Sequence, residues 1–109
     1  MKSGIQLIAI ERQEQIEKHG RTVDHDFIAN SDGQLREAAV TMASMEHTDK
    51  GTFLAPEGWD EESFKRMYYS KCYVDKLIVA GAFIAAEIDR INYELKINTD
   101  ILASLNPST

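Results

Sequence analysis

The chain has 109 residues, of which 43% are hydrophobic, and a net charge of −6 from 12 basic and 18 acidic side chains. This length and composition predict one soluble globular domain over residues 1–109. The acidic balance disfavours non-specific binding to DNA, RNA or an anionic membrane, so we expect neither nucleic acid nor membrane as a partner. A single cysteine, Cys72, excludes an intramolecular disulfide and fits a reducing cytosol.

The first residues lack the apolar core of a signal peptide, and the longest apolar run, residues 77–86, is about half of the ~20 residues that span a membrane. We therefore expect a cytoplasmic protein.

The first predicted helix covers residues 4–19. Ser3 and Gln6 have the spacing of a capping box, and Gly20 is a typical helix stop. Residues 21–31 then read as a polar connection. A second helix is expected from Asp32, with Ser31 and Gln34 at capping-box spacing, and it should fade near Glu46, before Gly51 in the following loop.

The third predicted helix begins after Asp60 as its N-cap, with Trp59 and Phe64 at the positions of a hydrophobic staple. A bend or break is expected near residues 69–70, followed by a long apolar helix to about Lys96. Thr99 could then cap a short terminal turn within a tail of residues 98–109, which leaves residues 3–97 as the ordered core. The fold class is all-α, a helical bundle of three main helices and a shorter one.

Residues 77–86 are apolar on every side and rich in alanine and glycine, which lets a neighbouring helix approach closely. A helix that is apolar all round must be covered on more than one face, and a chain this small offers little to cover it. The sequence therefore predicts self-association, as a homodimer or a homotetramer.

Three glutamates are candidate metal ligands: Glu11 on the first helix, Glu37 on the second and Glu87 at the end of the apolar run. A carboxylate at the edge of an apolar stripe must be paired, hydrogen-bonded, protonated or bound to a metal. Each also has an ordinary interpretation: Glu11 and Glu37 as solvated charges, and Glu87 as the partner of an Arg or Lys. Asp89 points about 160° away from Glu87 around a helix, so the two cannot share one ion.

Four other residues are candidates for substrate binding. His25 and Asp26 are adjacent in the predicted connection and could act as ligand and base, or only stabilise a turn. Gln34 lies at the edge of the second helix, where capping is the better interpretation. Trp59 is the staple residue, with stacking on a nucleobase as the alternative. No catalytic residue can be assigned, since the sequence has no Gly-rich phosphate loop, CxxC pair or HExxH motif.

Four segments, in this order, resemble a known family: residues 10–20, His25-Asp26, residues 33–39 and residues 77–90. They resemble small proteins of phages and bacterial mobile elements that are grouped with the MazG-like, all-α nucleoside triphosphate pyrophosphohydrolases. The similarity covers most of residues 8–92, and the last segment is the most specific.

The resemblance implies a helical bundle that pairs into a dimer or tetramer, with acidic side chains on neighbouring helices holding Mg²⁺, or Mn²⁺ in its place. It implies a nucleoside triphosphate bound through that metal and cleaved between its α and β phosphates. Glu11, Glu37 and Glu87 would be the metal ligands. The sequence departs from the family pattern in two ways. Gln34 stands at a position where the pattern has Glu, and the spacing of Glu87 and Asp89 does not place both on one face of a helix.

The leading hypothesis is thus a metal-dependent pyrophosphohydrolase that converts a nucleoside triphosphate to the monophosphate and pyrophosphate. The alternative is a non-catalytic helical homo-oligomer, of phage or mobile-element origin, that binds a protein partner or a nucleotide. Carboxylates that converge on one point favour the first hypothesis, and carboxylates that each find an Arg or Lys favour the second.

Overall fold

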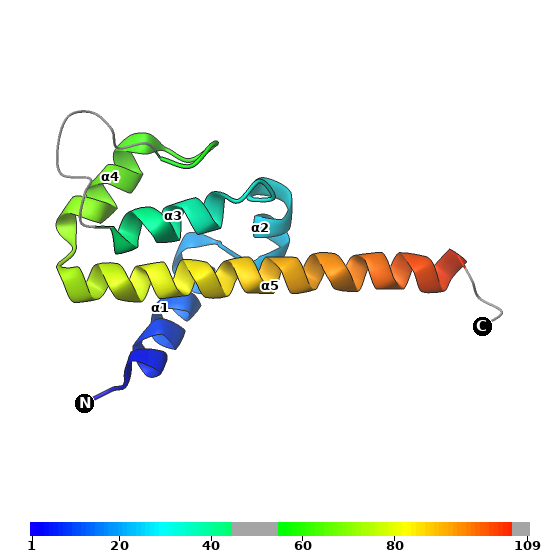
Figure 1. Ribbon diagram of the computed structural model, residues 1–109, viewed down its shortest axis with the longest axis horizontal. Coiled ribbons are helices and arrows are strands. Elements are labelled where there is room, and N and C mark those ends of the chain that lie inside the picture. The colour runs from blue at the N-terminus through cyan, green and yellow to red at the C-terminus, as the bar shows by residue number, and fades with distance from the viewer. Residues whose placement is uncertain (45–54, 106–109) are drawn as a thin grey trace.

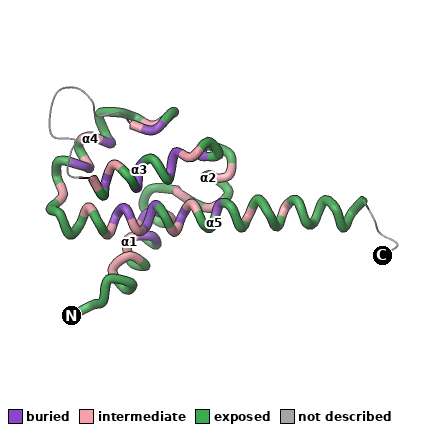
Figure 2. Tube along the Cα trace, viewed as in Figure 1, coloured by how far each residue is buried: buried purple, intermediate pink, exposed green. Residues whose placement is uncertain are grey.

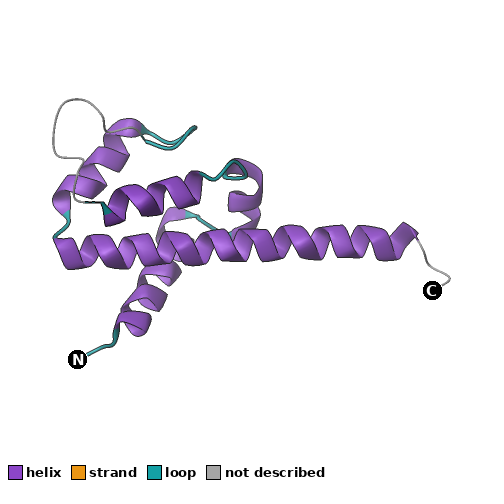
Figure 3. Ribbon diagram, viewed as in Figure 1, coloured by secondary structure: helices purple, strands orange, loops and turns teal. Residues whose placement is uncertain are grey.

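A computed structural model describes residues 1–44 and 55–105 (Figure 1). Within these ranges the chain is all-helical and has no strand, which confirms the predicted all-α class, but it has five helices where four were expected (Figure 3). The helices are α1 (Gly4–His19), α2 (Val23–Ala29), α3 (Gln34–Ala43), α4 (Glu61–Ser70) and α5 (Tyr73–Leu105).

The ends of α1 and the start of α4 follow the predicted signals. Ser3 Oγ accepts from Gln6 N at 3.2 Å and Gln6 Oε1 accepts from Ser3 N at 2.8 Å, so the capping box is complete. Gly20 ends α1 in the left-handed conformation, with φ 65°. These local hydrogen bonds satisfy backbone groups that the helix itself leaves free, which is why a short motif could predict them.

At α4, Asp60 caps the helix by accepting from Ser63 N at 3.1 Å, as predicted. The rings of Trp59 and Phe64 meet edge-on with centroids 5.5 Å apart, as expected of a staple. The break predicted after this helix is also present, because α4 ends at Ser70 and Lys71 has an extended backbone.

The prediction of a connection over residues 21–31 was wrong, because residues 23–29 form α2. Thr22 is its N-cap and accepts from His25 N at 3.3 Å. Asp24 and Asp26 lie in the first turn, where negative charge stabilises a helix. A helix of seven residues is too short to show an apolar period, so only the cap could have indicated it.

The predicted start of the second helix was also wrong. α3 begins at Gln34, and its N-cap is Gly33 at φ 82°, not Ser31. Gln34 instead accepts from Asp32 N at 2.7 Å through its side-chain oxygen, so the amide stabilises the turn before the helix. The predictions for residues 45–54, including the fading near Glu46 and the loop at Gly51, lie outside the described residues.

Helix α5 is longer than predicted and continues without interruption to Leu105. Thr99 does not cap a new turn, since its hydroxyl donates to Leu95 O at 2.9 Å within the same helix. Beyond the other helices, α5 projects as an isolated rod (Figure 1). No helix in the described part of the chain is both long enough and apolar enough to cross a membrane.

The core lies between α3 and α5, with α4 above it (Figure 2). Its buried side chains are those of Leu35, Ala38, Met42, Phe64, Tyr68, Val79, Phe83 and Ala86. On another face of α5, α1 crosses closely at Gly81, where an added Cβ would lie 2.6 Å from Ile8 Cδ1. The small residues of the apolar run therefore do allow close approach, and α1, α2 and α3 each contact α5.

Candidate functional site

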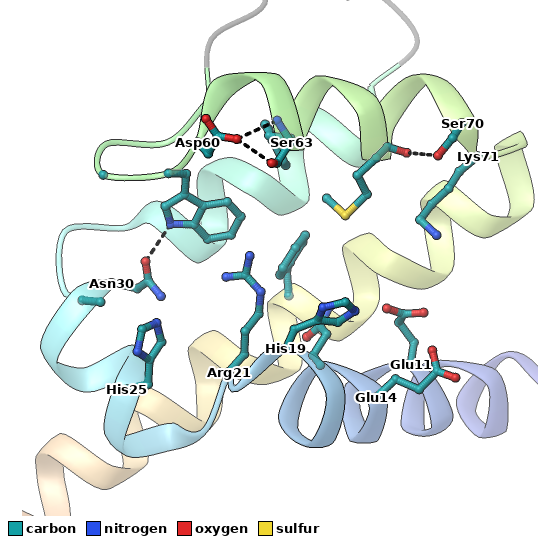
Figure 4. A pocket seen from close by; sticks show the side chains of 17 residues that line it. Glu11, Glu14, His19, Arg21, His25, Asn30, Asp60, Ser63, Ser70 and Lys71 are labelled. Atoms are coloured by element: carbon teal, nitrogen blue, oxygen red, sulfur yellow. Dashed lines mark hydrogen bonds between the residues drawn. The ribbon is translucent and has the colours of Figure 1, made fainter.

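A pocket of about 630 Å³ opens between α1, α2 and one side of α4 from Ser63 to Ser70, and α5 contributes Phe83 (Figure 4). This volume lies in the range of small-molecule sites. Its polar or charged lining residues are Glu11, Glu14, Gln15, His19, Arg21, His25, Asn30, Asp60, Ser63, Ser70 and Lys71, and its aromatic ones are Trp59, Phe64 and Phe83.

Helix α1 supplies the acidic end of the pocket. Glu11, Glu14, Gln15 and His19 recur at helical spacing, so one face of α1 lines the cavity. Burial raises the pKa of the Glu11 carboxyl and Glu14 raises it further, while the charges of Lys71 and His19 oppose them. A proton or a cation at Glu11 would relieve this cost of holding the charge.

Gln15 adds an unsatisfied acceptor to the same face. It is 3% exposed, and its Oε1 has no hydrogen-bond partner within the described parts of the chain. A buried carbonyl oxygen without a donor is costly, and such a group calls for an explanation. At this position a ligand donor, a water molecule or a cation could satisfy it.

Arg21 occupies the middle of the pocket. Its guanidinium lies 4.2 Å from the centroid of the Trp59 ring and 5.6 Å from that of Phe83. Burial lowers the pKa of Arg21, and nearby Asp26 opposes that effect. The result is a partly desolvated cation held over the Trp59 ring, a group well suited to bind an anion.

A chain of hydrogen bonds holds the Trp59 side chain in place. Trp59 Nε1 donates to Asn30 Oδ1 at 2.7 Å, and Asn30 Nδ2 donates to Asp26 Oδ1 at 2.8 Å. Asp26 is fully buried, and its other oxygen lies 3.9 Å from Arg12 Nη2. Burial raises the pKa of Asp26, although the bond from Asn30 and the charges of Arg12, Arg21 and His25 lower it.

Arg12 links this chain of bonds to α1 and α5. Its Nη1 donates to the Arg21 carbonyl at 3.0 Å, and its Nε donates to Asp89 Oδ2 at 3.4 Å. We refer to Arg12, Asp26, Asn30 and Trp59 as the polar cluster. It fixes the start of α2 and the position of Arg21 in the pocket.

The three predicted metal ligands do not lie in the same place, because only one of them lines the pocket. Glu11 lines the pocket, whereas Glu37 is exposed on α3 and does not. Glu87 accepts from Arg90 Nε at 2.6 Å and also lies outside the pocket. Within the described residues, no three His, Cys, Asp or Glu side chains form a group that could hold a metal ion. In one protomer the predicted set is therefore not assembled.

Of the predicted substrate-binding residues, His25 and Trp59 line the pocket. Asp26 does not, and belongs to the polar cluster behind it. Gln34 is the buried first residue of α3, and its Nε2 donates to Ala29 O at 3.4 Å. It stabilises the turn before the helix but forms no capping box, because the N-cap is Gly33 and no side chain caps the helix.

Sequence reasoning did not select several residues that line the pocket, chiefly Glu14, Gln15, Arg21 and Lys71. Arg21 enters the pocket because Gly20 reverses the chain after α1, and its amide donates to Gln15 O at 2.9 Å. Lys71 reaches it from the break between α4 and α5. Both follow a helix end, and no periodic pattern reports which way such residues point. Comparison of the chain with family models, curated proteins and solved structures found no match.

Proposed function

We propose that this pocket binds a nucleoside triphosphate and that the chain hydrolyses it, with a divalent metal ion, to the monophosphate and pyrophosphate. The observation that supports this most is the combination within one cavity of three carboxylates, several basic side chains and an aromatic wall. A polyanionic ligand with an aromatic base and a bound cation has the complementary set of groups.

The basic side chains supply the attraction for phosphate. Arg21, Lys71, His19 and His25 all line the cavity, although the whole chain carries a charge of −6. Two of these residues, Arg21 and Lys71, are cations, whereas three carboxylates line the same cavity, so a polyanion would bind there together with a metal ion that balances the negative charge. Arg21 offers a planar donor group that matches phosphate oxygens, and the polar cluster holds it in place.

The acidic end fits Mg²⁺ rather than a metal held wholly by protein. Mg²⁺ is commonly bound by one or two carboxylates, with waters and substrate phosphates as its other ligands. Glu11 and Glu14 lie on adjacent turns, and the unsatisfied Gln15 Oε1 lies on the same face. Mg²⁺ bound there would neutralise charge on the phosphates and favour attack by water.

The proposed reaction forms a bond between a water oxygen and the α phosphorus and breaks the bond from that phosphorus to the bridging oxygen. Pyrophosphate leaves with the bridging oxygen, and the water proton passes to solvent or a pocket base. Arg21 and Lys71 would hold the phosphates in line for this attack. Trp59, fixed by Asn30, would contact the base or ribose.

The test is pyrophosphate release from a panel of nucleoside triphosphates with Mg²⁺ or Mn²⁺. We expect metal-dependent turnover that falls by about 100-fold or more in Glu11→Gln and in Glu14→Gln. Glu17→Gln is the matched control, because Glu17 is exposed on the same helix and does not line the pocket. Absence of turnover, or equal loss in the control, would contradict the proposal.

Glu37→Gln and Glu87→Gln separate two forms of the site. If these variants lose activity and Glu14→Gln does not, the metal is held by the three-helix set that the family resemblance implies, assembled between copies of the chain. If they keep activity, the ligands are those of the pocket face of α1.

One observation supports self-association, which both hypotheses include. Many large apolar side chains of α5 are exposed, among them Ile84, Ile88, Ile91 and Leu95. A long exposed apolar surface is typical of an interaction site. Such a surface is compatible with either function.

A further inference from the structure

Six of the exposed apolar residues of α5 lie along one stripe of the helix. From residue 84 onwards they follow alternating steps of four and three, which is a heptad repeat. We refer to Ile84, Ile88, Ile91, Leu95, Asn98, Leu102 and Leu105 as the seam. The six apolar members are 40% to 70% exposed, and Asn98, the one polar member, is exposed as well.

The rest of the described chain packs on other faces of α5. Core residues Val79, Phe83 and Ala86 face α3, and Tyr93 meets the Phe27 ring of α2 with centroids 5.3 Å apart. Past Arg90, every residue of α5 except Tyr93 and Ile97 is exposed. The outer part of this helix therefore gains little stability from packing in the monomer, and a helical segment of such length is marginal in water on its own.

We propose that residues 84–105 of α5 form a parallel two-stranded coiled coil with a second copy of this chain. A strict 3.5-residue period winds two helices around each other so that the same stripe stays in contact along its length. The seam is self-complementary, because the same apolar positions recur over three heptads. This inference is independent of the proposed catalytic function.

Asn98 favours the parallel orientation. In a parallel pair, each layer of the seam faces itself, so the two Asn98 amides can hydrogen-bond to each other. In an antiparallel pair, Asn98 would face one of the alternate seam positions of the other helix, all of which are Ile or Leu. A buried amide without a partner is costly, so that orientation is disfavoured.

Charges beside the seam favour the same orientation. Glu87 and Glu94 flank one side of it, and the neutral Asn92 and Thr99 flank the other. In a parallel pair, each glutamate lies near a neutral residue of the second helix, whereas an antiparallel pair brings glutamates together. Arg90 binds both Glu87 and Glu94, which moderates this second effect.

The crossing of α1 sets where the coiled coil begins. Ile8 packs over Gly81, one turn before Ile84, and closes that part of the helix to a second copy. In the parallel arrangement the two helical bodies therefore lie side by side at one end, and the paired α5 helices extend away from them. Phe83 lines the pocket and Ile84 lies in the seam, so the two pockets would lie near the start of the coil.

The first test measures molar mass by analytical ultracentrifugation over a range of concentrations of the full chain. We expect a dimer, with a dissociation constant that rises by about 100-fold or more in Leu95→Glu and in Ile88→Glu. Val40→Glu is the matched control, because Val40 is 62% exposed on α3, away from the seam. Circular dichroism of the variants checks that the body stays helical.

The second test determines orientation by crosslinking. In a Cys72→Ser background, Asn98→Cys should form an intermolecular disulfide under mild oxidation, and Asp100→Cys on the outer side of α5 should form far less. A monomer at all concentrations, or a dimer that both seam variants leave intact, would overturn the coiled coil. A dimer that shows no preference for crosslinking at position 98 would overturn the parallel arrangement.

Discussion

The α3–α5 interface and the polar cluster are both buried, but they are held together by different forces. The interface is apolar, and its residues need only fill the available volume. In the polar cluster, every side chain needs its partner, because Arg12 and Asp26 are charged groups removed from water. The comparison suggests that the first region sets the stability of the fold, and that the second positions the pocket at some cost in stability.

The largest effect should come from the apolar interface. Leu35 is fully buried, and Leu35→Ala leaves a cavity that the packed helices cannot readily fill. We expect the free energy of unfolding to fall by about 2–5 kcal/mol, with little dependence on pH. Urea unfolding at pH 5 and pH 8 measures both quantities. A loss that differs strongly between the two pH values would mean that the interface is coupled to titrating groups.

In the polar cluster, the loss of stability on removing one charged side chain should depend on whether its partner still carries a charge. Arg12→Met leaves Asp26 buried without its nearest cation, and we expect a loss of about 3 kcal/mol at pH 8. The loss should be smaller at pH 5, because the variant further raises the pKa of Asp26 and a protonated Asp26 carries no charge.

Replacing both partners sharpens this prediction. Arg12→Met with Asp26→Leu removes the two charges together, so the double variant should be more stable than Arg12→Met alone. If the double variant instead loses the sum of the two single-variant losses, Arg12 and Asp26 do not interact. The polar cluster would then not differ from the apolar interface in needing its partners.

A smaller effect is expected at Trp59. Trp59→Phe keeps an aromatic ring against Phe64 but removes the donor to Asn30. We expect a loss of about 1–2 kcal/mol from the unsatisfied Asn30 oxygen and the reduced volume. In a nucleotide-binding assay the same variant should weaken binding, since Arg21 loses part of its aromatic support. Unchanged stability and binding would show that the hydrogen bond contributes to neither.

The smallest effect should be a change in pH dependence at Glu11. Its pKa in the folded chain is raised above 4.5, so between pH 4.5 and that raised value the folded state binds more protons than the unfolded state. The free energy of unfolding therefore falls as pH rises through this window. Glu11→Gln should remove that decrease, with equal stability near pH 4 and higher stability than wild type at pH 7.

Mg²⁺ offers a check on the same residue. If Glu11 and Glu14 hold the ion, Mg²⁺ should raise the melting temperature of the wild type at pH 7 and have less effect on Glu11→Gln. An equal response of both proteins would place any bound metal elsewhere.

The sequence predicted those parts of the fold that depend on neighbouring residues. The cap at Ser3, the stop at Gly20 and the cap at Asp60 each satisfy backbone groups within one turn. The start of α3 was mispredicted because Ser31 and Gln34 fit the same pattern without using it. Here Gly33 adopts a left-handed conformation and the Gln34 side chain bonds to the turn, an outcome that spacing alone cannot distinguish.

The site was less predictable, because its residues come from segments that are distant in sequence. Glu11, His25 and Trp59 were identified from their residue type, and all three line the pocket. Arg21 and Lys71 follow helix ends, and Asp26 is buried by contacts with Arg12 and Asn30 that no local pattern contains. The Glu87–Arg90 pair is local to α5, but the contacts of Arg12 with Asp26 and Asp89 arise only when the helices pack together.

The projecting part of α5 has a hydrodynamic consequence. The chain measures 59 × 37 × 22 Å and has a radius of gyration of 16.3 Å, against about 13 Å for a compact domain of this length. An elongated particle diffuses more slowly than a sphere of equal mass and leaves a size-exclusion column early. The protein should therefore elute ahead of compact standards even as a monomer, so its subunit number must be obtained from mass rather than from elution volume.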